Sequence, residues 1–285
     1  DILDECMYEL KWMLTMQDPN DGGVYNKVTT LKFPDMRMPA KDKEDRYVIG
    51  KSTDCALDFA ATMALASRIY KGNEDYPDFS EKAIKAAKKA YEFAEKKGEI
   101  VFMNPSDCNT GEYSAPGQSD EKFWAACEML ITTGEDKYAS DITLFQIFNV
   151  PFWGDVRTLG LVSLLINKDN LSAKIDKGAV ERKYRALIDN LLSLYKFSPG
   201  KLPITDFFWG SNGQVANSGA LLAIGAKVFN QDKYMEAAYY CYDYLLGENT
   251  TGYSFLTGFG RISPKHIHDR RSTSDGIANP LPGYL

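Results

Sequence analysis

Apolar residues recur at helical spacing along most of this chain, and this periodicity limits the fold more than any other feature. The first apolar stripe consists of Ile2, Leu3, Cys6, Met7, Leu10, Met13 and Leu14, and it ends before Pro19. Similar patterns predict further helices at about 53–71, 80–97, 119–133, 136–147, 156–166, 175–196, 212–229 and 232–246. Ser80 suits an N-cap, and helix ends are expected at Gly72, Gly98, Gly134 and Gly247. We therefore expect an all-α protein.

Several of these helices are apolar or alanine-rich around more than half of their circumference, as in 59–69 and 215–228. Such helices pack on more than one side, which fits an inner layer of helices surrounded by an outer one. Short turns between consecutive helices indicate antiparallel hairpins. We therefore expect an α/α-barrel, and because no stretch has the composition of a linker, we expect a single domain over 1–285.

Four long irregular stretches interrupt the helices, at 18–52, 99–118, 197–211 and 248–285. Irregular loops of this length are uncommon in a compact domain and are often functional. In a barrel of hairpins they would gather on one face, so we expect a cleft there.

Composition and charge exclude several classes of function. At 44% apolar and 25% charged residues, the chain has the composition of a soluble globular protein. The formal charge of −6 is small and spread along the sequence, without the basic patch of a nucleic-acid binder. No apolar run reaches the roughly 20 residues that a membrane-spanning helix needs. We expect neither nucleic acid nor membrane as a partner, and a neutral ligand is compatible with this charge.

Cysteine and histidine are too scattered or too few for most metal sites. Cys6, Cys55, Cys108, Cys127 and Cys241 are far apart and contain no C-x-x-C pair, and four of them lie in apolar helical patterns, so we expect structural thiols rather than a disulfide or a zinc site. His266 and His268 are the only histidines, which excludes a His-rich metal cluster by count.

His268 and Arg270 are the most informative candidate site residues. They lie in a segment, 254–270 (SFLTGFGRISPKHIHDR), that follows a strong helix and is broken by Gly, Ser and Pro. Imidazole and guanidinium groups can both donate hydrogen bonds to sugar hydroxyls. In a purely structural interpretation, His268 caps a turn and Arg270 pairs with an acid such as Asp269.

Loop aromatics are the second group of candidates, because a flat pyranose face packs well on an aromatic ring. Trp209 and Trp153 are the candidates for substrate contact, whereas Trp12 and Trp124 on helices are expected in the core. Other aromatics at helix starts or in loops are Phe207, Phe208, Tyr253, Phe255 and Phe259.

The segment 254–270 closely resembles the His-x-Arg signature of glycoside hydrolase family 9, the inverting β-1,4-glucanases. Further stretches resemble the family in its usual order: 22–30 (GGVYNKVTT), 45–48 (DRYV), the alanine-rich 58–70, 120–126 (DEKFWAA), 152–155 (FWGD), 209–212 (WGSN) and 244–249 (YLLGEN). The resemblance implies a toroid of twelve helices in six hairpins, a secreted endoglucanase or cellulase, and β-glucans or cello-oligosaccharides as substrates. It also implies that His268, as a catalytic and binding residue, contacts the sugar next to the scissile bond and that Arg270 helps to orient it.

The sequence also departs from the family pattern. Ile262 replaces the usual Asn, Lys or Arg, and Asp269 stands where a second histidine is common. The family's Asp-Ala-Gly-Asp segment with the catalytic base and its Asn-Glu motif with the general acid are expected outside this chain. We therefore expect an internal part of the catalytic domain, incomplete at both ends, that needs the remaining parts of the domain and has little or no hydrolytic activity alone.

A calcium site is the only cofactor site that the resemblance implies, and catalysis itself needs none. Asp120 and Glu121 open a helix, where carboxylates are favoured by the helix dipole, and this alone explains their position. The resemblance implies in addition a structural Ca²⁺ held by carbonyl oxygens of Pro116 and Gly117 and by the carboxylates of Asp120, Glu121 and Asp155. Three carboxylates, two carbonyls and water supply the six to eight oxygens that Ca²⁺ prefers.

Two alternatives remain open from the sequence. The first is a helical module that binds carbohydrate without cleaving it. The second is an unrelated α/α-barrel of the terpenoid or prenyl-transfer class. Asp1, Asp4 and Glu5 superficially resemble an Asp-rich magnesium motif, but no second metal motif follows at a suitable distance.

Overall fold

The computed structural model describes residues 1–198 and 200–285, and these form two compact units. The first unit comprises Asp1–Phe33, Asp45–Ile147 and Trp153–Val180, and the second comprises Pro34–Glu44, Phe148–Phe152 and Glu181–Leu285. Pro199, in the predicted irregular stretch 197–211, lies outside the described residues. About 52% of the chain is helical and little of it is strand, which confirms the all-α prediction.

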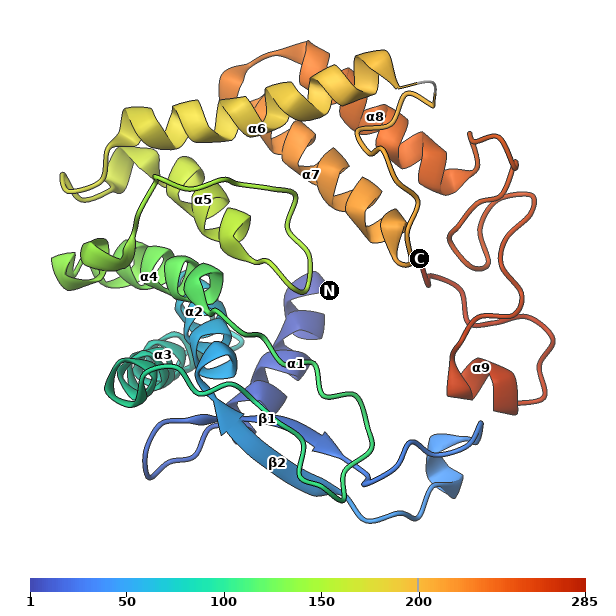
Figure 1. Cartoon of the computed structure of the whole chain (residues 1–285), viewed down its shortest axis with the longest axis horizontal. Coiled ribbons are helices and arrows are strands. Elements are labelled where there is room, and N and C mark those ends of the chain that lie inside the picture. The colour runs from blue at the N-terminus through green and yellow to red at the C-terminus, as the bar shows by residue number, and fades with distance from the viewer. Residues whose placement is uncertain (199) are drawn as a thin grey trace. The chain divides into compact units, whose positions relative to one another are not determined.

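The first unit is built around the helix α2 (Thr53–Ile69), which packs against both α3 (Phe79–Lys97) and α4 (Ser119–Thr133) (Figure 1). Ala60, Ala61, Met63 and Ala64 of α2 are completely buried, so the prediction that this helix packs on more than one side is confirmed. The helix α4 also packs against α5 (Arg157–Ile166), and α1 (Ile2–Thr15) precedes this group in the chain. Small alanine side chains allow α2 its two close neighbours.

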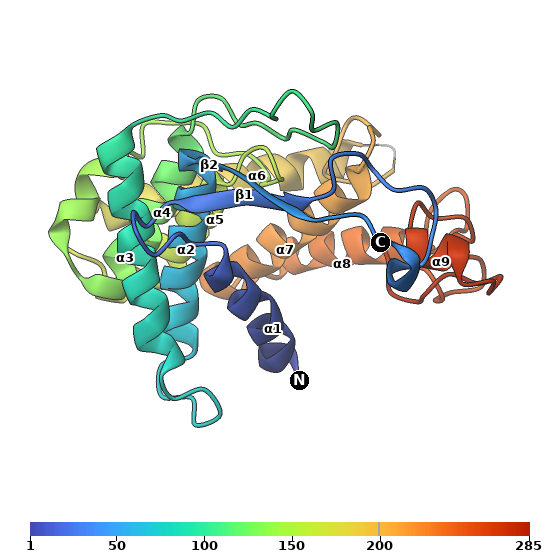
Figure 2. The same ribbon diagram turned by 90° about the horizontal axis from the view of Figure 1, so that it is seen from below.

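Two strands, which the sequence analysis missed, interrupt the predicted irregular stretch 18–52. The strands β1 (Val24–Thr29) and β2 (Tyr47–Ser52) pair antiparallel, with Val24 opposite Ser52 and Thr29 opposite Tyr47 (Figure 2). Lys27 on β1 donates hydrogen bonds from Nζ to Asn104 Oδ1 and to the Gly111 carbonyl, both at 2.7 Å. The hairpin therefore anchors the long loop between α3 and α4.

In the second unit, α7 (Ser211–Phe229) packs against α8 (Asp232–Leu246). A Cβ atom on Gly219 of α7 would lie 3.0 Å from Cys241 Cβ, so glycine allows these two helices to approach closely. The helix α6 (Lys177–Phe197) begins in the first unit and continues into the second, where Tyr184 Oη donates to the Leu221 carbonyl of α7 at 2.8 Å. The short 3₁₀ helix η1 (Pro39–Lys41) and the short helix α9 (Arg270–Ser274) also belong to this unit.

The helix predicted at 136–147 is wrong. Only a 3₁₀ helix, η2 (Asp136–Asp141), forms there, and Phe145 is 99% exposed. Tyr91 Oη donates to Asp141 Oδ2 at 2.6 Å and Lys122 pairs with Asp141 Oδ1 at 2.9 Å, so tertiary contacts fix the residue at which this helix ends. Another 3₁₀ turn, η3 (Lys168–Asn170), follows α5.

The predicted helix ends have mixed outcomes. Gly98, Gly134 and Gly247 are C-caps with positive φ, as predicted, whereas α2 ends at Tyr70, before Gly72. Ser80 is not an N-cap, because Asp78 holds that position and Ser80 Oγ donates instead to the Ser67 carbonyl.

Two expected core residues are exposed. Trp12 is 47% exposed and Cys6 is exposed, because the inward side of α1 is provided by Met7 and Leu10. Trp124 is partly buried, and its indole N–H donates to Glu128 Oε1 at 3.1 Å. In the described part of the chain, no helix combines the length and the apolar character needed to cross a bilayer.

Candidate functional site

His268 and Arg270 lie on either side of a firmly anchored residue in the second unit. Asp269 is the N-cap of α9, and its Oδ2 accepts hydrogen bonds from Ser272 N at 3.0 Å and Ser272 Oγ at 2.8 Å. The pKa of Asp269 lies below its usual range, mainly because of the hydrogen bond from the Ser272 N–H. The Ser272 hydroxyl and the nearby Arg271 lower it further. The backbone N–H of Asp269 donates to the Ile267 carbonyl at 2.9 Å, and its own carbonyl accepts from Thr273 N at 3.0 Å. His268 and Arg270 therefore flank a residue, Asp269, whose backbone and side chain are both held by hydrogen bonds.

The two candidate side chains differ in exposure. The His268 imidazole is exposed, whereas Arg270 is partly buried and its Nε donates to the Pro34 carbonyl at 3.1 Å. Asp269, which the structural interpretation paired with Arg270, lies 3.6 Å from Arg271 Nε. The bond from Nε fixes the Arg270 guanidinium against the backbone of Pro34 in the same unit.

Trp209 occupies the turn that precedes α7 and is 94% exposed. Gly210, with φ of +83°, caps α7 in the left-handed conformation that favours glycine. Nearby rings connect this turn to the segment 254–270, since Phe207 lies 6.4 Å from Tyr244 and Tyr244 lies 5.3 Å from Phe255, measured between ring centroids. The second unit therefore contains both Trp209 and the His268–Arg270 pair, and ring contacts connect Phe207, near Trp209, through Tyr244 to Phe255.

Trp153 belongs to the first unit and is 77% exposed. Its ring meets the ring of Tyr113 edge to face, with centroids 6.5 Å apart. Tyr113 has a φ of +52°, a left-handed conformation that is rare for a non-glycine residue. A Cβ on Gly111 would meet the outer edge of the Tyr113 ring, so a side chain there would require the ring to move. Sequence analysis missed Tyr113, for which its position in the loop 99–118 was the only available signal.

The predicted calcium ligands lie in the first unit and are brought together in part. Asp120 and Glu121 are buried at the start of α4, and Asp120 Oδ2 accepts a hydrogen bond from Val156 N, beside Asp155, at 2.9 Å. Glu121 Oε2 is buried without a hydrogen-bond partner, and burial, reinforced by Asp120, raises the pKa of Glu121 above its usual range. Among the described residues, however, no three acidic, histidine or cysteine side chains are already arranged as a metal site. The calcium site therefore stays a prediction.

Two further carboxylates, one buried and one partly buried, lie near this pair on α2, and sequence analysis missed both of them. Asp54 is buried and accepts a hydrogen bond from Ser52 Oγ. Burial, together with the charges of Asp54 and Asp120, raises the pKa of Asp58 to about 7. For Asp58, the available signal was an acidic residue inside the largely apolar, alanine-rich stretch 55–66.

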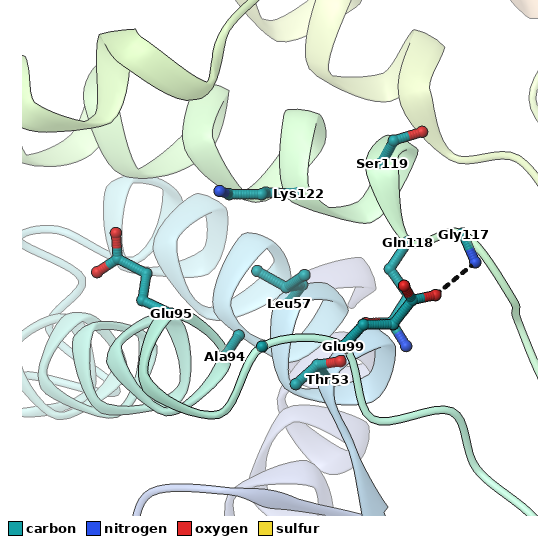
Figure 3. Close-up of a pocket in the computed structure, with 10 residues that line it drawn as sticks. Thr53, Leu57, Ala94, Glu95, Glu99, Gly117, Gln118, Ser119 and Lys122 are labelled. Atoms are coloured by element: carbon teal, nitrogen blue, oxygen red, sulfur yellow. Dashed lines mark hydrogen bonds between the residues drawn. The ribbon is translucent and has the colours of Figure 1, made fainter.

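A cavity of about 460 Å³ adjoins the loop that carries Gly117 (Figure 3). Its walls come from the start of α2, the end of α3 and the start of α4, with Leu57 and Ala94 as apolar parts and Glu95, Glu99 and Lys122 as charged parts. Glu99 Oε1 accepts the Gly117 N–H at 2.8 Å, and Gln118 Nε2 donates to the Ile100 carbonyl at 3.0 Å. These bonds fix the backbone of the predicted calcium loop.

The model of the glycosyl hydrolase family 9 matches residues 1–285, the whole of this sequence. The chain belongs to glycosyl hydrolase family 9. The family 9 domains among the matching solved structures are (α/α)₆ barrels, which confirms the predicted fold class.

Individual family 9 relatives agree with this assignment. The xyloglucan-specific endo-beta-1,4-glucanase BoGH9A of Bacteroides ovatus is 40% identical over 303 residues, covering 100% of this chain and 51% of that protein. A solved Bacteroides ovatus GH9 structure matches with a TM-score of 0.92 at 38% identity, covering 100% of this chain and 55% of that one. AaCel9A, solved in complex with cellobiose-like isofagomine, matches with a TM-score of 0.88 at 31% identity, covering 96% of this chain and 53% of that one. This family 9 chain thus spans about half the length of these relatives.

Proposed function

We propose that this chain forms part of the catalytic domain of a secreted endoglucanase that hydrolyses internal β-1,4-glucosidic bonds of β-glucans with inversion. Membership of family 9 supports glycoside hydrolysis, and the relatives include an endo-beta-1,4-glucanase. The single observation that carries the proposal to the level of residues is the anchored arrangement of His268, Asp269 and Arg270.

The proposed role of these residues is to bind and orient the sugar chain. The exposed His268 imidazole donates to a hydroxyl of the sugar beside the scissile bond, and Arg270 holds an adjacent hydroxyl. Trp209 offers a ring face to pyranose C–H groups within the second unit, and Trp153 offers one within the first unit. Inversion also needs a carboxylate base and a carboxylic acid about 6.5–9.5 Å apart, and we assign neither role to a residue of this chain.

The binding of cellotetraose tests this role directly. Titration calorimetry would compare the polypeptide with the variants His268→Ala, Arg270→Ala and Trp209→Ala. Each is expected to weaken binding about 5- to 150-fold, since each removes about 1–3 kcal/mol of hydrogen bonding or ring contact. The matched control is Arg261→Ala, an exposed arginine in the same segment, which should leave the affinity unchanged. Equal affinities for all variants would contradict the assignment.

Hydrolysis is tested separately from binding. In a polypeptide that contains this chain and cleaves cello-oligosaccharides, NMR of the first product formed should show the α-anomer, as inversion at a β-linkage requires. A β-anomer product would contradict the inverting mechanism. If a polypeptide that contains this chain binds cello-oligosaccharides but cleaves none of them, the result would favour a carbohydrate-binding module instead.

A structural Ca²⁺ and an extracellular location complete the proposal. The buried, unpartnered Glu121 Oε2 beside Asp120 is the observation that favours a cation, because it leaves a buried acceptor without a donor. Asp120, Glu121 and Asp155, with carbonyls of Pro116 and Gly117, would hold the ion, which would supply rigidity rather than chemistry. An extracellular location fits a polymeric substrate, and assay of the culture medium against the cell fraction tests it.

A further inference from the structure

The helix α8 has a second apolar stripe besides the face that packs against α7. The buried face consists of Tyr234, Ala237, Ala238, Cys241 and Leu245. The second stripe, called here the α8 seam, consists of Met235, Tyr239, Tyr242 and Leu246. Their spacing of four, three and four residues places them on one side of the helix. Tyr239 and Tyr242 are 62% and 63% exposed, so this apolar stripe is largely uncovered.

Contacts with α6 identify the opposite flank of α8. The ring centroid of Tyr240 lies 5.2 Å from that of Tyr195 on α6. Tyr195 Oη donates a hydrogen bond to Glu236 Oε1 at 3.1 Å. Lys233 Nζ lies 3.8 Å from Asp189 Oδ1, also on α6. Because successive residues of a helix are about 100° apart, these side chains and the α8 seam lie on opposite sides of the buried face. The helix therefore has a neighbour on one flank and an open apolar flank on the other.

An open flank of this kind is what an incomplete barrel leaves. In a closed ring of helical hairpins, each helix lies between two neighbours of its own layer. The matching solved domains are (α/α)₆ barrels, whereas the described part of this chain contains eight helices of ten or more residues. The chain covers 51% of BoGH9A and 55% of the solved Bacteroides ovatus structure. The α8 seam therefore suits the next helix of such a barrel.

The charges beside the α8 seam describe the partner further. Asp232, Glu236 and Asp243 lie along its outer edge, on the side of α8 away from the buried face. Lysine or arginine side chains on a facing helix would pair with these carboxylates, as at the edges of a coiled coil. A second copy of this chain would present the same carboxylates, because a two-fold interface uses the same patch on both partners. Since like charges repel, the α8 seam favours a helix of different sequence over its own copy.

We propose that the α8 seam binds an amphipathic helix from the remaining part of the catalytic domain, a helix with an apolar stripe and a basic edge. Tyr239 and Tyr242 are the central contacts, because large aromatic side chains in the middle of an interface contribute most to binding. The partner is thus a helix of the same domain, carried on the same polypeptide or on a second one.

The test uses a chimaera in which this chain replaces the matching segment of BoGH9A, so that the rest of a family 9 domain is present. Hydroxyl-radical footprinting with mass spectrometry measures the oxidation rate of single side chains in the chimaera and in the 285-residue chain. In the chimaera, the rates at Tyr239 and Tyr242 are expected to fall to that of the completely buried Tyr234. Tyr240, on the flank that faces α6, is the control on the same helix and should keep its rate.

Urea unfolding gives a second measurement. Tyr239→Glu and Tyr242→Glu place a charge in the α8 seam, so they should lower the unfolding midpoint of the chimaera and leave that of the 285-residue chain unchanged. Tyr240→Glu is the matched control, because it disrupts a contact with Tyr195 that both proteins contain and should lower both midpoints. Circular dichroism checks that each protein is folded.

Unchanged oxidation rates at both seam tyrosines in a folded chimaera overturn the proposal, and so do unchanged midpoints for both seam variants. Sedimentation velocity of the 285-residue chain provides a test that does not need the chimaera to fold. A monomer is expected, whereas a dimer that Tyr242→Glu converts to a monomer would assign the α8 seam to a second copy and overturn the proposal. These outcomes do not involve glucan binding or hydrolysis, so they leave the proposed function unaffected.

Discussion

Asp120 Oδ2 accepts a hydrogen bond from the backbone N–H of Val156 at 2.9 Å, so the first turn of α4 is fastened to the residue that precedes α5. The next residue, Glu121, has a buried oxygen without a partner. A buried carboxylate oxygen in this state is normally satisfied by a donor or a cation. This hydrogen bond holds Asp155, which directly precedes Val156, near the start of α4, where the proposed calcium ligands Asp120 and Glu121 lie.

Calcium is expected to stabilise the chain against heat. After treatment with a chelator, addition of Ca²⁺ at 100 times its Kd should add about 2.7 kcal/mol to the free energy of unfolding, because the ion binds only the folded state. Scanning calorimetry measures this as a rise in Tm. Glu121→Gln and Asp155→Asn should abolish the rise, and Asp169→Asn, an exposed acid elsewhere in the unit, should not. An unchanged Tm in the wild-type chain would contradict the proposed ion.

The buried pair of Arg68 and Glu128 is expected to be strongly coupled. Glu128 is completely buried, and its oxygens accept from Arg68 Nη2 at 2.5 Å and Trp124 Nε1 at 3.1 Å. Arg68→Met leaves a buried carboxylate without its cation, so it should lower the free energy of urea unfolding by about 3–5 kcal/mol. In the double variant with Glu128→Leu most of this loss should be recovered. Additive losses in the double variant would show that the pair is not coupled.

The ion pair of Asp18 and Lys51 predicts a loss of stability at acidic pH. The Lys51 ammonium, 2.6 Å away, and the Asn20 N–H lower the pKa of Asp18 to about 2, from about 3.9 in the unfolded chain. The contribution of Asp18 is therefore fully present above about pH 4 and is lost as the pH falls towards 2. Asp18→Asn should reduce the dependence of the unfolding free energy on pH in this window, whereas the exposed Asp35→Asn should not. Identical profiles for all three proteins would refute this role.

The change in unfolding free energy caused by a substitution at Gly225 on α7 is expected to differ in sign according to the residue at position 188. A Cβ there would clash with Ile188 Cδ1 of α6, so Gly225→Ala should destabilise by up to about 2 kcal/mol despite its better helix propensity. In an Ile188→Val background, which lacks that methyl group, the propensity gain of about 1 kcal/mol should prevail. Urea unfolding of the four proteins measures both effects. Destabilisation in both backgrounds would place the obstacle elsewhere, for example at Tyr184.

The helices were predictable where local chemistry determines them. Gly98 and Gly134 end α3 and α4 because only a residue tolerant of positive φ suits those caps, and this is visible in the sequence. The segment 136–147 was not predictable in this way, because Asp141 is held by Tyr91 and Lys122, which are distant in the sequence. The same holds for β1 and β2, whose pairing spans a loop of 17 residues, 30–46.

The candidate site was predictable as residues but not as an arrangement. His268 and Arg270 could be named from their pattern, whereas the cap that Asp269 forms depends on where α9 begins. Tyr113 was missed because its importance lies in its contacts with Trp153 and Gly111, not in any motif. The cavity between residues 265–267 and 272–278 depends on how these two stretches, on either side of His268 and Arg270, fold back toward each other.

Thr257 is completely buried and joins two parts of the second unit through four hydrogen bonds. Its N–H and Oγ1 donate to the carbonyls of Tyr284 and Leu281 at 2.8 and 2.7 Å, and its carbonyl and Oγ1 accept from Gly283 N and Tyr284 N, both at 2.9 Å. These four bonds close the loop formed by the residues between, His268 and Arg270 among them. Since even doubling the length of such a loop costs only about 0.6 kcal/mol, residues can be inserted or exchanged within it without unfolding the helices. New ligand preferences can thus be evolved or engineered in this loop while Thr257 and its hydrogen bonds are kept.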